Sequence, residues 1–167
     1  TVGTTVHGWR GTVDWRVVAR LAIGSVPATI LTLLILSQAG PASPTTGHVM
    51  SVILGVTLLL SAAATLLRAR TVTYLTPRFG TMSPRKLAGY TILLGAILGL
   101  LVSLTSVGAG ALGMTALLIL YPALPVNRLV GSDIAHAVPL TLLGGIGHWM
   151  LGSVDGALLV SLLIGLI

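Results

Sequence analysis

The chain contains no cysteine and no glutamate, and it has only three aspartates. Without cysteine, disulfides and thiolate metal sites are excluded. Charged residues make up 7% of the sequence, whereas soluble globular domains carry about 25%. This shortage of charge excludes an ordinary soluble domain. The shortage of carboxylates argues against a pathway for cations, which usually recruits them.

Apolar residues take the place of the missing charges: 54% of the 167 residues are hydrophobic, 21 are glycine and the mean hydropathy is +1.04. A helix needs about 20 apolar residues to cross a hydrocarbon core about 30 Å thick. The sequence therefore predicts an all-α, polytopic membrane helix bundle embedded in a lipid bilayer, with Gly95 and Gly99 on a small-residue packing face. The apolar stretches expected to be membrane helices are residues 17–37, 49–67, 87–105 and 134–150.

The net charge of +6 is concentrated rather than spread along the chain. Five of the nine basic residues lie in residues 68–86, a segment between two apolar stretches that prolines and a glycine interrupt. Such clustering follows the positive-inside rule, so we read it as a membrane feature and expect no nucleic-acid partner. We expect a cytoplasmic loop at 68–86, with residues 10–20 on the same side and residues 40–48 outside. The five basic residues are Arg68, Arg70, Arg78, Arg85 and Lys86.

A long uncharged stretch with a glycine-rich interruption is the central feature of the sequence. No charge occurs in the 41 residues between Lys86 and Arg128, yet small residues interrupt the run at 106–110 and again at Gly113. The apolar segment that follows, residues 111–121, has 11 residues and predicts a half-helix or re-entrant segment. Irregular backbone at membrane depth persists only where it is buried in protein or lines a cavity. Transporters hold substrate at such breaks.

Two segments of the sequence are related by a shift of 141 residues. Eight of 26 positions are identical when residues 1–26 are laid over residues 142–167, and the shared core is His-x-x-x-Gly-x-Val-Asp before an apolar run. Three arginines of the first copy become uncharged residues in the second, which predicts opposite membrane faces and hence inverted repeats.

The repeat also predicts how the chain is divided. The second copy has many more residues before its motif than the first, so we expect a truncated chain that lacks about 55 residues of the first repeat. Residues 1–67 would then hold the end of the first repeat and the membrane helices after it. Residues 68–86 would be the basic cytoplasmic loop, and residues 87–167 the second repeat with its glycine-broken helix.

Two further motifs accompany the glycine-rich break and the repeat: Tyr-Pro-Ala-Leu at 121–124 and Val-Gly-Ser-Asp-Ile-Ala-His-Ala at 130–137. Together, these motifs resemble the sulfite exporter TauE/SafE family of membrane permeases, also called the toluene sulfonate uptake permease group. The family's glycine motif is usually richer in glycine, whereas Ala109 and Ala111 stand among the glycines here. The resemblance implies paired repeats with a broken segment in each, and transport of small sulfur-containing anions such as sulfite, thiosulfate or organosulfonates. The motifs are Gly-Ala-Gly-Ala-Leu-Gly at 108–113, Tyr-Pro-Ala-Leu at 121–124, Val-Gly-Ser-Asp-Ile-Ala-His-Ala at 130–137, and the His-x-x-x-Gly-x-Val-Asp copies from His7 and His148.

The first candidate substrate site is the break itself. Gly108, Gly110 and Gly113 would expose backbone N–H groups at the start of the half-helix, where the helix dipole favours an anion. Glycine that only permits close helix packing is the alternative. Thr105 and Ser106 would donate hydrogen bonds to substrate oxygens, or else bond back to a carbonyl one turn earlier.

The second candidate is the motif that contains Ser132, Asp133 and His136. Asp133 and His136 are three residues apart, so on a helix they share a face. Ionisable groups inside a membrane usually face a cavity or a partner, and an imidazole that titrates near neutral pH would let the pair relay a proton. The alternative is that Asp133 caps a helix at the membrane surface and His136 bonds a carbonyl.

The repeated histidines complete the set of candidate substrate-binding residues. His7 and His148 occupy equivalent positions in the two copies, each after a segment rich in glycine or threonine. Asp14 and Asp155 also recur, and each precedes an apolar run as a helix N-cap would.

The leading functional prediction is a secondary transporter of small sulfur-containing anions in the bacterial inner membrane. We expect no cofactor and no metal, and homo-oligomerisation is left open. The first alternative is a cation or metal transporter that uses Asp133, His136 and His148, and the second is a non-transporting membrane subunit. An enzyme is not expected, because no Ser/His or paired-carboxylate arrangement occurs.

Overall fold

The computed structural model describes residues 13–38, 44–79, 82–105 and 109–150, together with residues 156, 160 and 161. No strand occurs within these ranges. The helices are α2 (Trp15–Gln38), α3 (Pro44–Leu66), α4 (Arg68–Phe79), α5 (Pro84–Thr105), α6 (Ala109–Leu120) and α7 (Val126–Met150).

Four of these helices are long and apolar enough to cross a membrane. They cover Trp15–Gln38, Gly47–Leu66, Pro84–Thr105 and Val126–Met150. Each of these spans contains one of the four predicted apolar stretches. The single exception is residue 67, which was predicted to end the second stretch and lies just after the second span. The predicted polytopic helix bundle is therefore confirmed.

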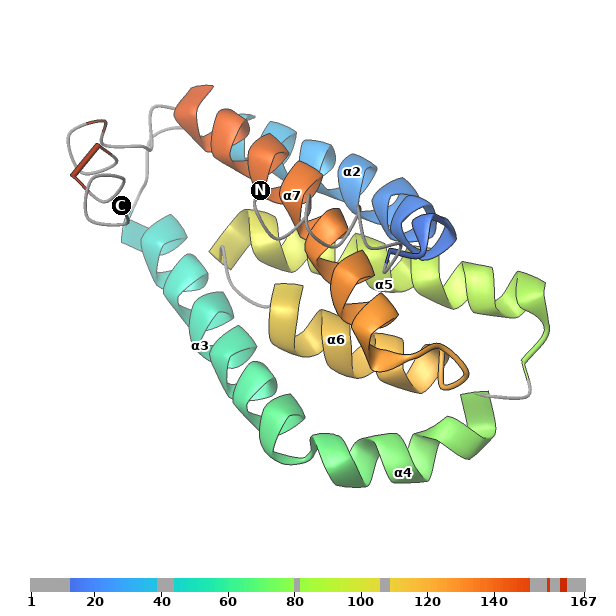
Figure 1. Cartoon of the computed structure of the whole chain (residues 1–167). Coiled ribbons are helices and arrows are strands. Elements are labelled where there is room, and N and C mark those ends of the chain that lie inside the picture. Colours follow the sequence, from blue (N-terminus) through green and yellow to red (C-terminus); the bar gives the residue numbers. More distant parts are fainter. Residues whose placement is uncertain are drawn as a thin grey trace.

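The short helix α6 lies in the middle of the bundle (Figure 1). It contacts α3, α4, α5 and α7. Twelve residues rise about 18 Å, less than a hydrocarbon core of about 30 Å, so at least one end of α6 lies at membrane depth. Its neighbours provide the protein surroundings that such an end requires. The predicted half-helix is thus present, beginning two residues earlier than expected.

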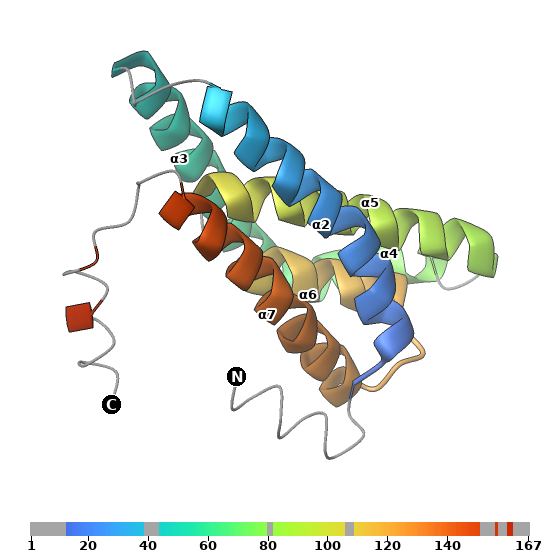
Figure 2. The same ribbon diagram turned by 90° about the horizontal axis from the view of Figure 1, so that it is seen from above.

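Helices α2 and α5 pack with their backbones in direct contact, and Figure 2 shows the two helices crossing. A Cβ at Gly95 would collide with the carbonyl oxygen of Leu21, and one at Gly24 would collide with the carbonyl oxygen of Ile92. A Cβ at Gly99 would lie 2.5 Å from the carbonyl oxygen of Ser25. The predicted packing face on α5 is confirmed, and α2 contributes Gly24 to the same contact.

The start of α2 is fixed by Asp14. The carboxylate oxygen Oδ1 accepts the backbone N–H groups of Arg16 at 3.0 Å and Val17 at 3.3 Å, two of the groups that have no partner within the helix at its N-terminus. The predicted N-cap is confirmed. The N–H of Asp14 itself donates to the hydroxyl of Ser132 at 2.8 Å, which ties the start of α2 to α7.

Cationic side chains gather at one end of the bundle. Ser25, near the middle of α2, meets His136, while Leu33 near its end meets Gly147, so α2 and α7 run in the same direction. Leu21 and Ser25 meet Gly95 and Gly99 in order, so α5 runs that way too. The N-termini of these three helices therefore lie together, and we call this the basic end. Its residues are Arg16, Arg20, Arg85, Lys86 and Arg128.

Three predicted boundaries need correction. Most of the expected loop at 68–86 is helix α4. Beside a membrane, a helix is favoured over a loop because it satisfies its own backbone hydrogen bonds. The expected turn at 40–48 is shorter, because α3 begins at Pro44 and proline is favoured in a first helical turn. The helix expected at 134–150 begins earlier, because residues 126–133 already belong to α7.

The membrane sides and the division into repeats stay predictions. Half of the residues in the two repeat copies, including His7 and Asp155, lie outside the described residues.

Candidate functional site

The first turn of α6 is open. Gly110 is exposed, and a Cβ placed on it would meet no atom within 4 Å. Space therefore exists beside this backbone for a small ligand. The neighbouring candidates Ser106 and Gly108 lie outside the described residues.

Gly113, one turn further along α6, is buried and lies against a carboxylate from α7. A Cβ at position 113 would be 2.8 Å from Oδ1 of Asp133 and 3.3 Å from Cδ1 of Leu98. The absence of a side chain is thus what lets Asp133 approach the α6 backbone. Asp133 lies two turns inside α7, so the alternative in which it caps this helix at the membrane surface is wrong.

His136 reaches a different helix. Its Nε2 atom is 2.8 Å from Oγ of Ser25 on α2, and both residues are only 1% exposed. A hydroxyl rather than a carbonyl is therefore the partner, and it pairs with an imidazole nitrogen either as donor or as acceptor. Burial of this polar pair is affordable because each group satisfies the other.

Asp133 and His136 share α7 but not a partner. Asp133 lies against Gly113 of α6, whereas His136 bonds Ser25 of α2. No hydrogen bond joins the two side chains in the described part of the structure. A proton relay between them stays a prediction, and any transfer would need a bridging group or a rearrangement.

Two other candidates, Thr105 and Ser132, form hydrogen bonds with the backbone. Thr105 donates its hydroxyl to the carbonyl of Leu101 at 2.7 Å, one turn earlier. This bond is the alternative to substrate binding that was considered for Thr105. Ser132 is fully buried, and its hydroxyl donates to the carbonyl of Arg128 at 2.7 Å while accepting the N–H of Asp14. These bonds fix helices, and they leave little hydrogen-bonding capacity for a ligand.

His148 lies at the far end of α7 from the basic end. Its Nε2 donates to the carbonyl oxygen of Ser103 at 2.8 Å, which joins α7 to α5. A cavity of about 250 Å³ adjoins it, lined also by Val102, Thr141, Gly144 and Gly145. Across the residues that the structure describes, no three His, Asp or Glu side chains come together as a metal site would require.

Sequence reasoning missed a directed chain of hydrogen bonds near the basic end. Arg20 of α2 donates from Nη1 to the hydroxyl of Tyr121 at 3.2 Å. Tyr121, just after α6, lies 2.8 Å from Oγ1 of Thr91 on α5. Since the Thr91 hydroxyl proton goes to the carbonyl of Leu87 at 2.7 Å, Tyr121 must be the donor to Thr91. Neither Tyr121 nor Thr91 carries a sequence signal that would reveal this contact.

Comparison with known proteins agrees with the resemblance. The family model described as "Sulfite exporter TauE/SafE" matches residues 1–167. A curated protein of Bacillus subtilis (strain 168), "Probable membrane transporter protein YjnA", is 34% identical over 164 residues, which are 98% of this chain. The chain spans 64% of the length of that relative. No solved structure matches the chain.

Proposed function

Since this chain belongs to the sulfite exporter TauE/SafE family, a family of multi-pass membrane transporters, we propose that it transports small sulfur-containing anions such as sulfite, thiosulfate or organosulfonates. The bilayer would be the bacterial inner membrane. The name of the Bacillus relative specifies a transporter without a substrate. The choice of anion class therefore rests on the family and on the chemistry of the α6 break.

The uncharged first turn of α6 is the observation that carries this proposal. Open space lies beside Gly110, and free backbone N–H groups at a helix N-terminus attract anions. No lysine or arginine lies between Lys86 and Arg128, so neutral groups would hold the anion. A permanent cation would bind a divalent oxyanion more tightly, and release would be slower.

Asp133 adds a means of coupling. Its carboxylate lies against Gly113, one turn from the open end of α6. An ionised carboxylate there would repel an anion, and a protonated one would accept it, by the Coulomb interaction at short range. We therefore include in the proposal that a proton enters with the anion and that Asp133 carries it.

A flux assay on vesicles containing the purified chain tests the proposal. Uptake of radiolabelled sulfite, thiosulfate and an organosulfonate would be compared with uptake of Zn²⁺ and Mn²⁺, with and without an inward proton gradient. We expect anion uptake that the proton gradient accelerates and that Asp133→Asn uncouples from it. Uptake of the metals alone would favour the cation transporter, and no uptake at all would favour a non-transporting subunit.

A further inference from the structure

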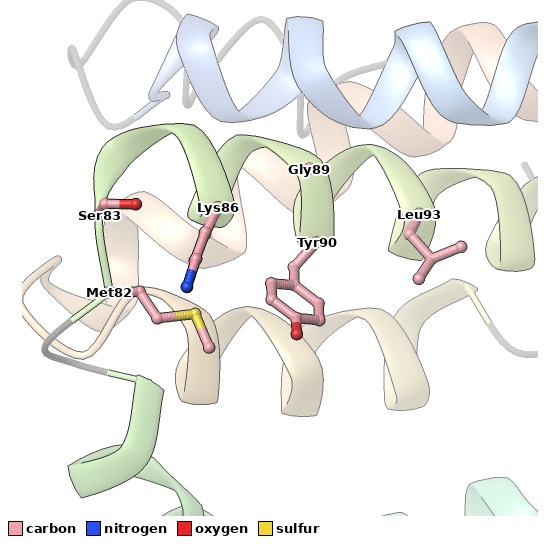
Figure 3. A pocket seen from close by; sticks show the side chains of 6 residues that line it. All are labelled: Met82, Ser83, Lys86, Gly89, Tyr90 and Leu93. Carbon is pink, nitrogen blue, oxygen red and sulfur yellow. The ribbon is translucent and has the colours of Figure 1, made fainter.

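A cavity at the basic end lies apart from the α6 break. It has a volume of about 570 Å³ and is lined by Met82, Ser83, Lys86, Gly89, Tyr90 and Leu93. In Figure 3, the side chains of Lys86, Tyr90 and Leu93 leave α5 on the same side, with Met82 beneath Lys86. The transport mechanism proposed above uses none of these residues.

The lining changes in character along α5. Lys86 and Ser83 supply an ammonium group and a hydroxyl at the first turn, and Tyr90 and Leu93 supply an aromatic ring and an aliphatic chain further along. Seven residues of helix rise about 10 Å, so the cavity extends from a cationic mouth along an apolar wall. Tyr90 is 45% exposed and Leu93 is 55% exposed, which leaves that wall open at the side.

The position of the cavity in the bilayer determines what can enter it. α5 is a candidate membrane span that begins at Pro84, so Lys86 in its first turn lies at the level of the headgroups and Leu93 lies at the level of the acyl chains. An anionic phospholipid has the same order of chemistry, with a phosphate above two apolar chains. Basic pockets beside membrane helices bind such headgroups.

We propose that this cavity binds one anionic phospholipid, with its phosphate against Lys86 and Ser83 and an acyl chain along Tyr90 and Leu93. A free sulfur oxyanion would use the cationic mouth but not the apolar wall. A second copy of this chain would need a carboxylate for Lys86. Of the three aspartates, Asp14 caps α2 and Asp133 lies against Gly113, which leaves few counter-ions to offer.

Native mass spectrometry of the purified chain in detergent, with added phosphatidylglycerol or phosphatidylcholine, tests the proposal. We expect one retained phosphatidylglycerol and no retained phosphatidylcholine. Lys86→Gln should lower phosphatidylglycerol occupancy about fivefold, because one cation near a membrane surface contributes about that factor. Arg85→Gln removes the same charge from the neighbouring residue, which does not line the cavity, and should leave occupancy unchanged.

A second pair of variants fills space without altering charge. A Cβ at Gly89 meets nothing within 4 Å, so Gly89→Leu should fold and occupy the cavity, lowering lipid retention while Lys86 stays in place. Gly55→Leu on α3 is the matched control, since a Cβ there also meets nothing within 4 Å. Excess sulfate should not displace the lipid.

Several results would overturn the proposal. Equal loss in Lys86→Gln and Arg85→Gln would reduce it to a diffuse charge effect. Equal retention of phosphatidylcholine would mean that the headgroup is not recognised. Displacement by sulfate would assign the mouth to a free anion, and a dimer that Gly89→Leu abolishes would assign the cavity to a second copy.

Discussion

The carboxylate of Asp133 rests on the bare backbone of Gly113, because a Cβ at position 113 would lie 2.8 Å from Oδ1. Gly113→Ala should therefore push the end of the Asp133 side chain away while leaving the helices in place. We expect transport to fall by about tenfold, since small misplacements at a site cost factors of this order or more. The melting temperature in detergent should stay close to that of the parent.

Gly55→Ala on α3 is the control for this variant. Its added methyl meets nothing within 4 Å, so both activity and melting temperature should match the parent. Parent-level transport by Gly113→Ala would show that the approach of Asp133 to α6 has no part in function.

Gly110→Val tests the open turn of α6 directly. Because nothing lies within 4 Å of a Cβ at this position, the larger side chain should be accommodated and the protein should insert. It should also block the approach of an anion to the backbone, so anion flux into vesicles should be lost. Transport at the parent rate would place the substrate site elsewhere.

His136→Gln separates titration from shape. Glutamine can keep a hydrogen bond to Ser25 but cannot change its charge, so one ionisable step should disappear from the pH profile of transport. Asp133 keeps its own step in this variant. A full parental profile would make His136 a structural residue and would remove it from any proton path.

Ser25→Ala supplies the structural comparison for His136. The imidazole would lose its buried partner, and we expect a loss of stability of about 1 kcal/mol. If His136 serves only in packing, Ser25→Ala should lower the melting temperature and leave the shape of the pH profile of transport unchanged.

Gly95→Ala should weaken the fold itself. The added methyl would collide with the carbonyl oxygen of Leu21, a backbone atom that cannot rotate away. Overpacking of this kind costs about 1–3 kcal/mol, so the melting temperature in detergent should fall. Gly55→Ala, whose methyl enters open space on α3, should melt with the parent, and equal melting of the two variants would contradict the observed contact.

The absence of cysteine makes the membrane orientation easy to test. Single cysteines at Ser43 and Ser83 would be treated with an impermeant reagent from the outer face of intact cells. The clustering of arginine and lysine predicts labelling at 43 and protection at 83. The opposite pattern would invert the assigned sides.

The sequence was sufficient for the features that the bilayer or local chemistry imposes. The thickness of the hydrocarbon core sets the length of a span, which is why all four long helices were predicted, although α7 begins at Val126 rather than at residue 134. Asp14 caps the turn that follows it directly in the sequence, so its role could be predicted. The Gly95–Gly99 pair needs only some helix to pack against it, and the sequence did not have to say which one.

The rotation of each helix about its axis was beyond reach. Spacing put Asp133 and His136 on one face of α7, but it could not say that this face lies between α6 and α2, or that Ser25 waits opposite His136. The contact of Arg20 with Tyr121 spans 101 positions of sequence. Such pairings depend on how the helices pack together, and a single sequence carries no direct record of that.

The contact between the α2 and α5 backbones has a mechanical consequence. With Gly24 seated on one helix and Gly95 and Gly99 seated on the other, neither helix can slide or roll past its neighbour without a collision of main-chain atoms. In the transport cycle proposed above, the pair would therefore move as one rigid body. Any motion that exposes the proposed site at the α6 break to one side of the membrane and then the other would have to leave the contact between α2 and α5 unchanged.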